Sequence, residues 1–277
     1  MNESAQPPVL RTEPISAAGT PPERWVAILH GIFGAGRNWT TVARRLVRAR
    51  PEWGALIVDL RQHGGSRGFA PPHTLAAAAA DLPRAFAATG LPVRAVLGHS
   101  FGGKVALELV RSHAESLALE SLWLVDSPPG AHAPGGSAWE VLEALRRAPG
   151  PFPGREAGVS ALRGLGVAEG VARWMTTNLE ERSNGWVWRI DPEDMEQLLG
   201  DFFRQNLWGV VENPPPGLDL HVVKADESSA LDEEACRRVE AAVARSGRVH
   251  LHRVAGGHWV NADNPDAMLE LLESALP

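Results

Sequence analysis

The chain has 277 residues, 44% of them hydrophobic and 22% charged, and its formal net charge is -6 at pH 7. This is an ordinary globular composition, and the lack of a basic stripe argues against nucleic acid or an anionic membrane surface as a partner. A lone cysteine, Cys236, leaves no internal disulfide, and the sequence shows neither a secretory signal in residues 1–24 nor an apolar run of about 18 residues for a membrane helix. We expect a cytoplasmic, soluble protein without integral membrane association, whose partners are small neutral or apolar molecules.

Short apolar runs recur along the chain, each bounded by Gly, Pro or charged residues. Such runs are typical of buried strands. They are WVAILH (25–30), ALIVDL (55–60), RAVLG (94–98), SLWLVD (121–126), DLHVVK (219–224) and RVHLHRV (248–254).

Helical patterns lie between these runs. NWTTVARRLVRA places its apolar residues on one face behind a possible N-cap at Asn38, and TLAAAAADLPRAF does the same with a kink expected at Pro83. Near the end, DNPDAMLELLESAL offers a cap at Asp263 or Asn264 and Pro265 at the first helical position. Alternating strands and helices predict an α/β fold with a mostly parallel central sheet and helices on both faces.

One long segment, residues 127–215, breaks the alternation. It opens with SPPGAHAPGG, closes with NPPPG and contains helical patterns but no clear strand, so we predict a helical lid inserted into a core of residues 25–126 and 216–277. Half of the ten tryptophans lie in it, either as packing residues or as the lining of an apolar pocket. Residues 1–24 are a tail or an edge hairpin around PVLRTEPIS, and we favour the hairpin.

The stretch GHSFGG, residues 98–103, fits the G-x-S-x-G pattern of a nucleophilic serine. It follows a predicted strand and opens a predicted helix, a context in which a tight turn lifts the hydroxyl of Ser100 out of the sheet. Gly98 and Gly102 leave room for that turn, and the helix directs its N-terminal N–H groups at developing negative charge. The alternative is a serine that merely occupies a glycine-rich turn.

A serine nucleophile needs a base and an oxyanion site. His258, in AGGHWV, is the best placed of ten histidines because it lies in a Gly-rich loop after the last strand, unless it only caps that loop. The backbone N–H groups of Phe101 and of Ile32, in HGIFG (30–34), are the expected oxyanion donors, unless that loop is a plain turn.

The other histidines give no clear indication of a catalytic or metal site. His250 and His252 share one face of a strand, as half a metal site would, but no acidic or cysteine partner stands at ligand spacing, so we expect no metal. We interpret DLRQHGGS (59–66), with its His63, as a structural turn.

Together, LHGIFGAGRNW, VDLRQHGGS, GHSFGGK, WLVDSPP and AGGHWVNADNP resemble the α/β-hydrolase superfamily and, within it, the small esterases grouped with abhydrolase domain-containing protein 11. The resemblance covers nearly the whole chain from about residue 25. It implies a serine hydrolase that acts on carboxylic esters or thioesters under a helical cap, without a cofactor.

The position of the acidic residue that would pair with His258 departs from the commonest superfamily pattern. The usual G-x-x-D after the penultimate strand is replaced by KADESS (224–229), which places Ser228 at the aspartate position. The resemblance instead implies Asp126, after the strand that follows the nucleophile helix, with Ser228 as an auxiliary. Asp226 and Glu227 are the alternative acids, and Asp126 would then only cap a turn.

We therefore expect acyl transfer through an acyl-enzyme, with Ser100, His258 and Asp126 as the catalytic set. Two other classes stay open. One is an enzyme of the same fold with different chemistry, such as C–C bond hydrolysis, acyl transfer or perhydrolysis. The other is a non-catalytic protein that binds a ligand beneath the lid.

Overall fold

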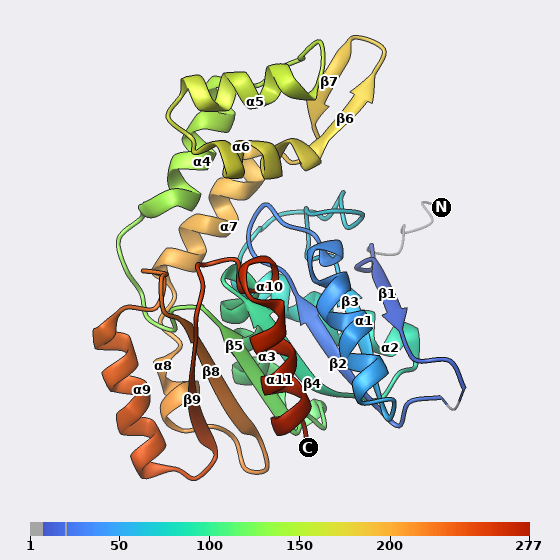
Figure 1. Ribbon diagram of the computed structural model, residues 1–277, viewed down its shortest axis with the longest axis vertical. Helices are drawn as coiled ribbons and strands as arrows, with labels where there is room; N and C mark the ends of the chain where they lie inside the picture. The colour runs from blue at the N-terminus through green and yellow to red at the C-terminus, as the bar shows by residue number, and fades with distance from the viewer. Residues whose placement is uncertain (1–7, 20) are drawn as a thin grey trace, which may run out of the picture.

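The computed structural model describes residues 8–19 and 21–277. Within them, the main sheet has seven strands in the order β1-β3-β2-β4-β5-β8-β9, and every neighbouring pair is parallel except β1 with β3 (Figure 1). The strands are β1 Thr12–Ile15, β2 Arg24–Leu29, β3 Trp53–Val58, β4 Val93–His99, β5 Ser121–Val125, β8 Asp219–Ala225 and β9 Val249–Val254. The six predicted strands and the mostly parallel sheet are confirmed.

Helices cover both faces of this sheet. One apolar layer joins α2 and α3 to alternate strand residues such as Ala27 and Leu29, and the other joins α1 and α11 to their neighbours Val26 and Ile28. The period of two along β2 therefore divides its residues between the two layers. The helices of the core are α1 Thr40–Ala49, α2 Leu75–Thr89, α3 Phe101–His113, α9 Glu233–Arg245, α10 Val260–Asp263 and α11 Pro265–Ala275.

Local side chains set several helix ends. Asn264 caps α11 by accepting a hydrogen bond from Ala267 N–H at 3.2 Å, and Pro265 occupies the first turn, as predicted. Helix α2 runs on through Pro83. The predicted N-cap at Asn38 is wrong, because a 3-10 turn, Gly36–Trp39, precedes α1 and the Asn38 side chain accepts from Ala35 N–H instead.

The long insertion lies between β5 and β8 and projects from one end of the core (Figure 1). Its elements are α4 Gly136–Arg147, α5 Arg155–Gly164, α6 Glu169–Met175, β6 Leu179–Arg182, β7 Gly185–Trp188, α7 Pro192–Arg204 and α8 Trp208–Glu212. The expectation of no strand here is wrong, because β6 and β7 pair as an antiparallel hairpin. Its two-residue loop is Ser183-Asn184, and Gly185, with a φ of 122°, is the first residue of β7.

The prediction of a hairpin near the N-terminus is also wrong. Within PVLRTEPIS, β1 is a single strand that pairs with β3 at the sheet edge, because β2 is already enclosed between β3 and β4. Residues 1–7 and 20, which the predicted tail or hairpin included, lie outside the described residues.

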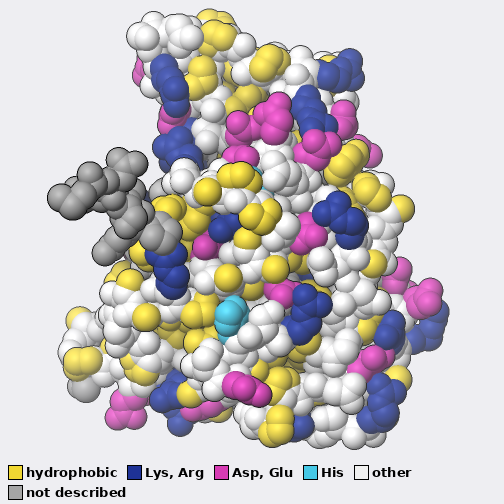
Figure 2. All heavy atoms as spheres, turned by 180° about the vertical axis from the view of Figure 1, so that it is seen from behind, with side chains coloured by type: hydrophobic (Ala, Val, Ile, Leu, Met, Phe, Trp, Pro, Cys, Tyr) yellow, Lys and Arg dark blue, Asp and Glu magenta, His cyan; other side chains and the backbone are white. Residues whose placement is uncertain are grey.

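The surface carries charges of both signs. Figure 2 shows Lys and Arg side chains interspersed with Asp and Glu over one whole face of the molecule. In the described part of the chain, no helix is both long and apolar enough to cross a bilayer.

Candidate active site

Ser100 lies in a strained turn between β4 and α3. Its φ of 52° and ψ of -117° place a non-glycine residue in a region that L-residues rarely adopt. Glycines on both sides allow the close approach: a Cβ on Gly98 would lie 2.3 Å from the carbonyl oxygen of Gly102, and one on Gly102 would lie 2.6 Å from that of His30. The turn thus has the backbone that the sequence pattern predicts.

The neighbouring strand holds this turn. Ser100 N–H donates to the carbonyl of Val125 at 2.9 Å, and the hydroxyl of Ser127 donates to the carbonyl of Ser100 at 2.6 Å. With both backbone groups bonded to residues of β5 or just beyond it, the side chain of Ser100 is held above the sheet, where it contacts His258.

A chain of hydrogen bonds joins Ser100, His258 and Asp126. His258 Nε2 lies 3.0 Å from Ser100 Oγ, and His258 Nδ1 lies 2.6 Å from Asp126 Oδ2. Because an ionised carboxylate can only accept, Nδ1 carries the proton and Nε2 is free to accept the serine proton. The histidine loop is fixed in turn by His99, whose Nε2 donates to the His258 carbonyl at 2.7 Å.

Asp126 is completely buried at the end of β5. Burial alone would raise its pKa, but hydrogen bonds from His258 and Ser228 and from the N–H of Ala225 hold the pKa below its ordinary value. The carboxylate is therefore ionised where it faces the imidazole.

The alternative acids lie elsewhere. Asp226 is exposed, and its Oδ1 lies 3.8 Å from Arg253 Nη1. Glu227 is exposed and lines a cavity. Among the hydrogen bonds of the described residues, neither carboxylate reaches His258.

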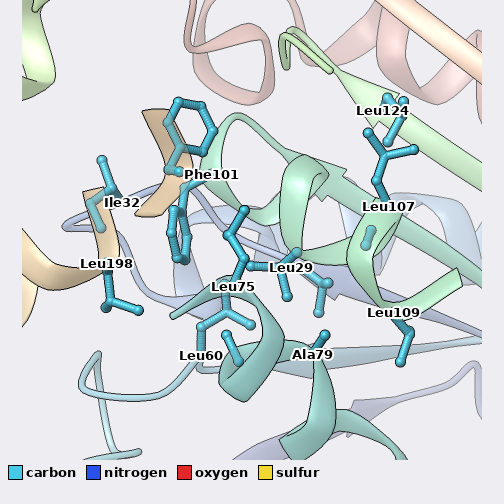
Figure 3. Close-up of a cluster of buried hydrophobic side chains, with 14 of the residues drawn as sticks. Leu29, Ile32, Leu60, Leu75, Ala79, Phe101, Leu107, Leu109, Leu124 and Leu198 are labelled. Carbon is cyan, nitrogen blue, oxygen red and sulfur yellow. The ribbon is translucent and has the colours of Figure 1, made fainter. Parts of the chain in front are cut away.

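Ile32 and Phe101 both line the cavity beside Ser100. Phe101 is the first residue of α3, where an N–H has no carbonyl one turn earlier to bond. Across the described part of the chain, neither Ile32 N–H nor Phe101 N–H donates to a protein acceptor. Their side chains point into the buried cluster that contains Leu29 and Leu75 (Figure 3), which anchors both backbones while the N–H groups stay available.

Two side chains from distant segments fix the loop that carries Ile32. Phe33, with a φ of 60°, donates its N–H to His63 Nε2 at 3.1 Å and accepts at its carbonyl from Asn178 Nδ2 at 2.8 Å. His63 Nδ1 donates to the carbonyl of Arg61 at 2.8 Å, so its other nitrogen is the acceptor. Burial lowers the pKa of His63 to about 3, which keeps the ring neutral.

The contacts of His63 are structural, as expected, but they reach the loop of Ile32, and the sequence interpretation missed this role. The repeated His-Gly pair after two successive strands, in LHGIFG and RQHGGS, is the signal that could have linked the two loops. Asn178, from the insertion, carries no comparable signal.

Lys104 is a further buried group that the sequence interpretation did not weigh. Its Nζ donates to the carbonyls of Gly130 at 2.7 Å and Phe202 at 2.5 Å and lies 4.4 Å from the centre of the Phe202 ring. Burial lowers its pKa to about 8. The ammonium thus ties α3 to the loop after β5 and to the end of α7.

His250 and His252 pack with a third histidine, His221, and with Trp123. His221 Nδ1 lies 3.0 Å from His252 Nε2, and the His221 ring stacks on Trp123 at 4.0 Å between centroids. Across residues 8–19 and 21–277, no group of three or more His, Cys, Asp or Glu side chains is arranged to hold a metal ion.

Two cavities open at Ser100 and His258. The larger, of about 830 Å³, extends over the loop after β5, the end of α7 and the start of α9. The smaller, of about 520 Å³, extends between the loop after β2, the helices α4 and α6 and the segment around α10. Both volumes lie in the range typical of small-molecule sites.

The chain is similar to known proteins in both sequence and fold. A model described as "Alpha/beta hydrolase family" matches residues 26–271. The sequence is 27% identical over 261 residues to the sn-1-specific diacylglycerol lipase ABHD11 of Mus musculus, covering 91% of this chain and 80% of that protein. It is 24% identical over 266 residues to esterase YbfF of Escherichia coli (strain K12), covering 91% and 92%.

Solved structures show the same fold. A marine microorganism esterase superposes with a TM-score of 0.82 at 21% identity, over 97% of this chain and 99% of that one. The thioesterase domain from the curacin biosynthetic pathway superposes with a TM-score of 0.68 at 18% identity, over 96% and 99%.

Proposed function

This chain belongs to the alpha/beta hydrolase family, and from that premise we propose that it cleaves carboxylic esters or thioesters by acyl transfer to Ser100. The observation that carries the proposal is the hydrogen-bonded chain from Ser100 through His258 to Asp126. Related proteins named as a lipase and an esterase support ester hydrolysis in general.

In the first half-reaction, His258 Nε2 takes the Ser100 proton as Oγ bonds to the substrate carbonyl carbon. The Phe101 and Ile32 N–H groups stabilise the negative charge on the carbonyl oxygen, and Asp126 stabilises the imidazolium. The bond to the alcohol or thiol then breaks, and the leaving group receives the proton from His258.

In the second half-reaction, water replaces the leaving group. His258 takes a proton from the water as its oxygen attacks the acyl carbon, and the bond to Ser100 Oγ breaks as Oγ regains a proton. The products are a carboxylic acid and free enzyme, so no cofactor is consumed. We propose residues 127–215 as the lid, because residues of α4, α6 and α7 line the cavities beside Ser100.

The test is intact-protein mass after incubation with a fluorophosphonate probe, run on wild type, Ser100→Ala and His258→Ala. We expect one adduct on wild type and none on either variant. An absence of adduct on wild type, together with no turnover of an activated ester, would overturn the mechanism in favour of a ligand-binding protein.

A further inference from the structure

The two cavities that meet at Ser100 have different walls. They share Ile32, Ser100, Ser137, Ala138 and His258 and diverge from there. Because an ester has two parts on either side of its carbonyl, two cavities that meet at the nucleophile can each hold one part.

The smaller cavity suits an aliphatic chain. Val141 on α4, Val171 and Trp174 on α6, and Trp259 before α10 line it, and the rings of Trp174 and Trp259 are 5.8 Å apart between centroids. None of its described lining residues is Asp, Glu, Lys or Arg. Methylene groups gain from such walls, whereas a charged group would lose its hydration without a partner.

The larger cavity is lined by negatively charged side chains that are exposed to solvent. The exposed carboxylates of Glu227, Asp232 and Glu234 line it. Of the described residues in its lining, Arg238 is the one Lys or Arg, and its Nε pairs with a Glu212 carboxylate oxygen at 2.7 Å while its guanidinium lies over the Trp208 ring. The acidic side chains therefore outweigh the basic one at this cavity.

We propose that the acyl chain binds in the smaller cavity and the leaving group in the larger, so that the substrates are aliphatic esters or thioesters with an uncharged or cationic leaving group. The proposal rests on the proposed function. Polyanionic leaving groups such as coenzyme A are repelled by the three carboxylates, whereas hydroxyl-bearing alcohols find polar walls and an exit to solvent.

The first test concerns the acyl side. Along p-nitrophenyl esters from acetyl to decanoyl, we expect kcat/KM to rise by about threefold to fourfold per added methylene until the cavity is full. Val171→Trp, which fills the smaller cavity, should lower the ratio of octanoyl to acetyl kcat/KM by at least about tenfold. Its matched control is Ala133→Trp in the larger cavity, which should leave that ratio within about twofold. An unchanged ratio in Val171→Trp, or a flat chain-length profile, would overturn the acyl assignment.

The second test concerns the charge of the leaving group. S-butyryl-pantetheine and butyryl-coenzyme A carry the same thioester bond but differ in phosphate charge, and we expect wild type to prefer the neutral compound by at least about tenfold at low salt. Glu227→Gln with Glu234→Gln should narrow this preference several-fold. Glu240→Gln, an exposed residue of α9 outside the cavity lining, is the matched control and should preserve it.

Different results would overturn the charge assignment and the proposed function. Equal or faster turnover of the coenzyme A thioester would overturn the charge assignment and leave the hydrolase mechanism standing. Absence of turnover of every substrate, with no fluorophosphonate adduct on wild type, would instead overturn the proposed function.

Discussion

The core and the insertion contribute different things to the site. Ser100 and Asp126 stand at the ends of neighbouring parallel strands, and hydrogen bonds to adjacent strands hold their backbones. The insertion instead supplies cavity walls such as Trp174 and Phe202, which stand on helices beyond the sheet. We infer that the core sets the chemistry and the charge of the leaving group, whereas the insertion sets the choice of acyl chain.

The largest expected effect tests the core side of this comparison. Asp126→Asn should lower kcat on the order of 10⁴-fold, because an amide cannot stabilise the imidazolium and favours the wrong histidine tautomer. Asp226→Asn, which changes an exposed acid that makes no hydrogen bond to His258 among the described residues, should change kcat by less than about threefold. Steady-state kinetics on a p-nitrophenyl ester distinguish them, and a larger loss in Asp226→Asn would reassign the acid.

A second prediction tests whether a residue of the insertion also positions the catalytic loop. Loss of the bonds to Phe33 in His63→Ala or in Asn178→Ala should displace the Ile32 N–H and lower kcat by roughly 100-fold, with a smaller change in KM. His63→Gln, which can both accept and donate at similar positions, should recover part of the loss. If KM changes while kcat does not, the loop serves substrate binding, and Asn178 gives no exception to the division between core and insertion.

A third prediction concerns pH and the stability of the core. Burial lowers the pKa of both His63 and His99 to about 3, below the value near 6.5 of an exposed histidine. As the pH falls, these two histidines therefore take up protons at a higher pH in the unfolded chain than in the folded one. Their contribution to the free energy of unfolding is fully present above about pH 6.5 and is lost toward pH 3. Between pH 6.5 and 4.5, the protonation of each ring should lower the free energy of unfolding by about 2 kcal/mol.

Denaturant unfolding at these two pH values measures the effect. His63→Gln should remove about half of the loss that the two rings cause, since glutamine does not titrate. A loss of stability that His63→Gln leaves unchanged would show that other groups govern the acid transition.

The smallest expected effect lies where core and insertion meet. Lys104→Met keeps a side chain of similar length but removes the ammonium group, so the carbonyls of Gly130 and Phe202 lose their donor. The free energy of unfolding should fall by about 1 to 2 kcal/mol. Thermal unfolding followed by calorimetry measures this, and an unchanged or higher melting temperature would contradict the role of Lys104 as a tie between α3 and α7.

The sequence predicts the core better than the insertion, for physical reasons. A strand buried on both faces leaves an apolar run that stands out between glycines and charges, as ALIVDL and RAVLG do. The strands of the β6–β7 hairpin are four residues each, and β7 is only half-buried, so their composition gives little contrast.

Parts of the site also differ in how well the sequence predicts them. The turn at Ser100 is local in part, because Gly98 is required by contacts with Gly102 and Gly103, whereas Gly102 is required by the close approach of the neighbouring strand β2 at its end. The approach of Asp126 to His258 depends on the order of strands in the sheet, which places β5 beside β8 and β8 beside β9. The contacts of His63 and Asn178 with Phe33 join segments 30 and 145 residues apart, and no local pattern encodes them.

The most direct measurement is the profile of kcat/KM against acyl chain length for wild type, Asp126→Asn and Val171→Trp. We expect Asp126→Asn to lower every point by the same factor, because Asp126 acts on the chemistry and lines neither cavity. We expect Val171→Trp to change the slope, because Val171 of the insertion lines the cavity proposed for the acyl chain. A changed slope in Asp126→Asn, or a uniform loss in Val171→Trp, would contradict the division between core and insertion.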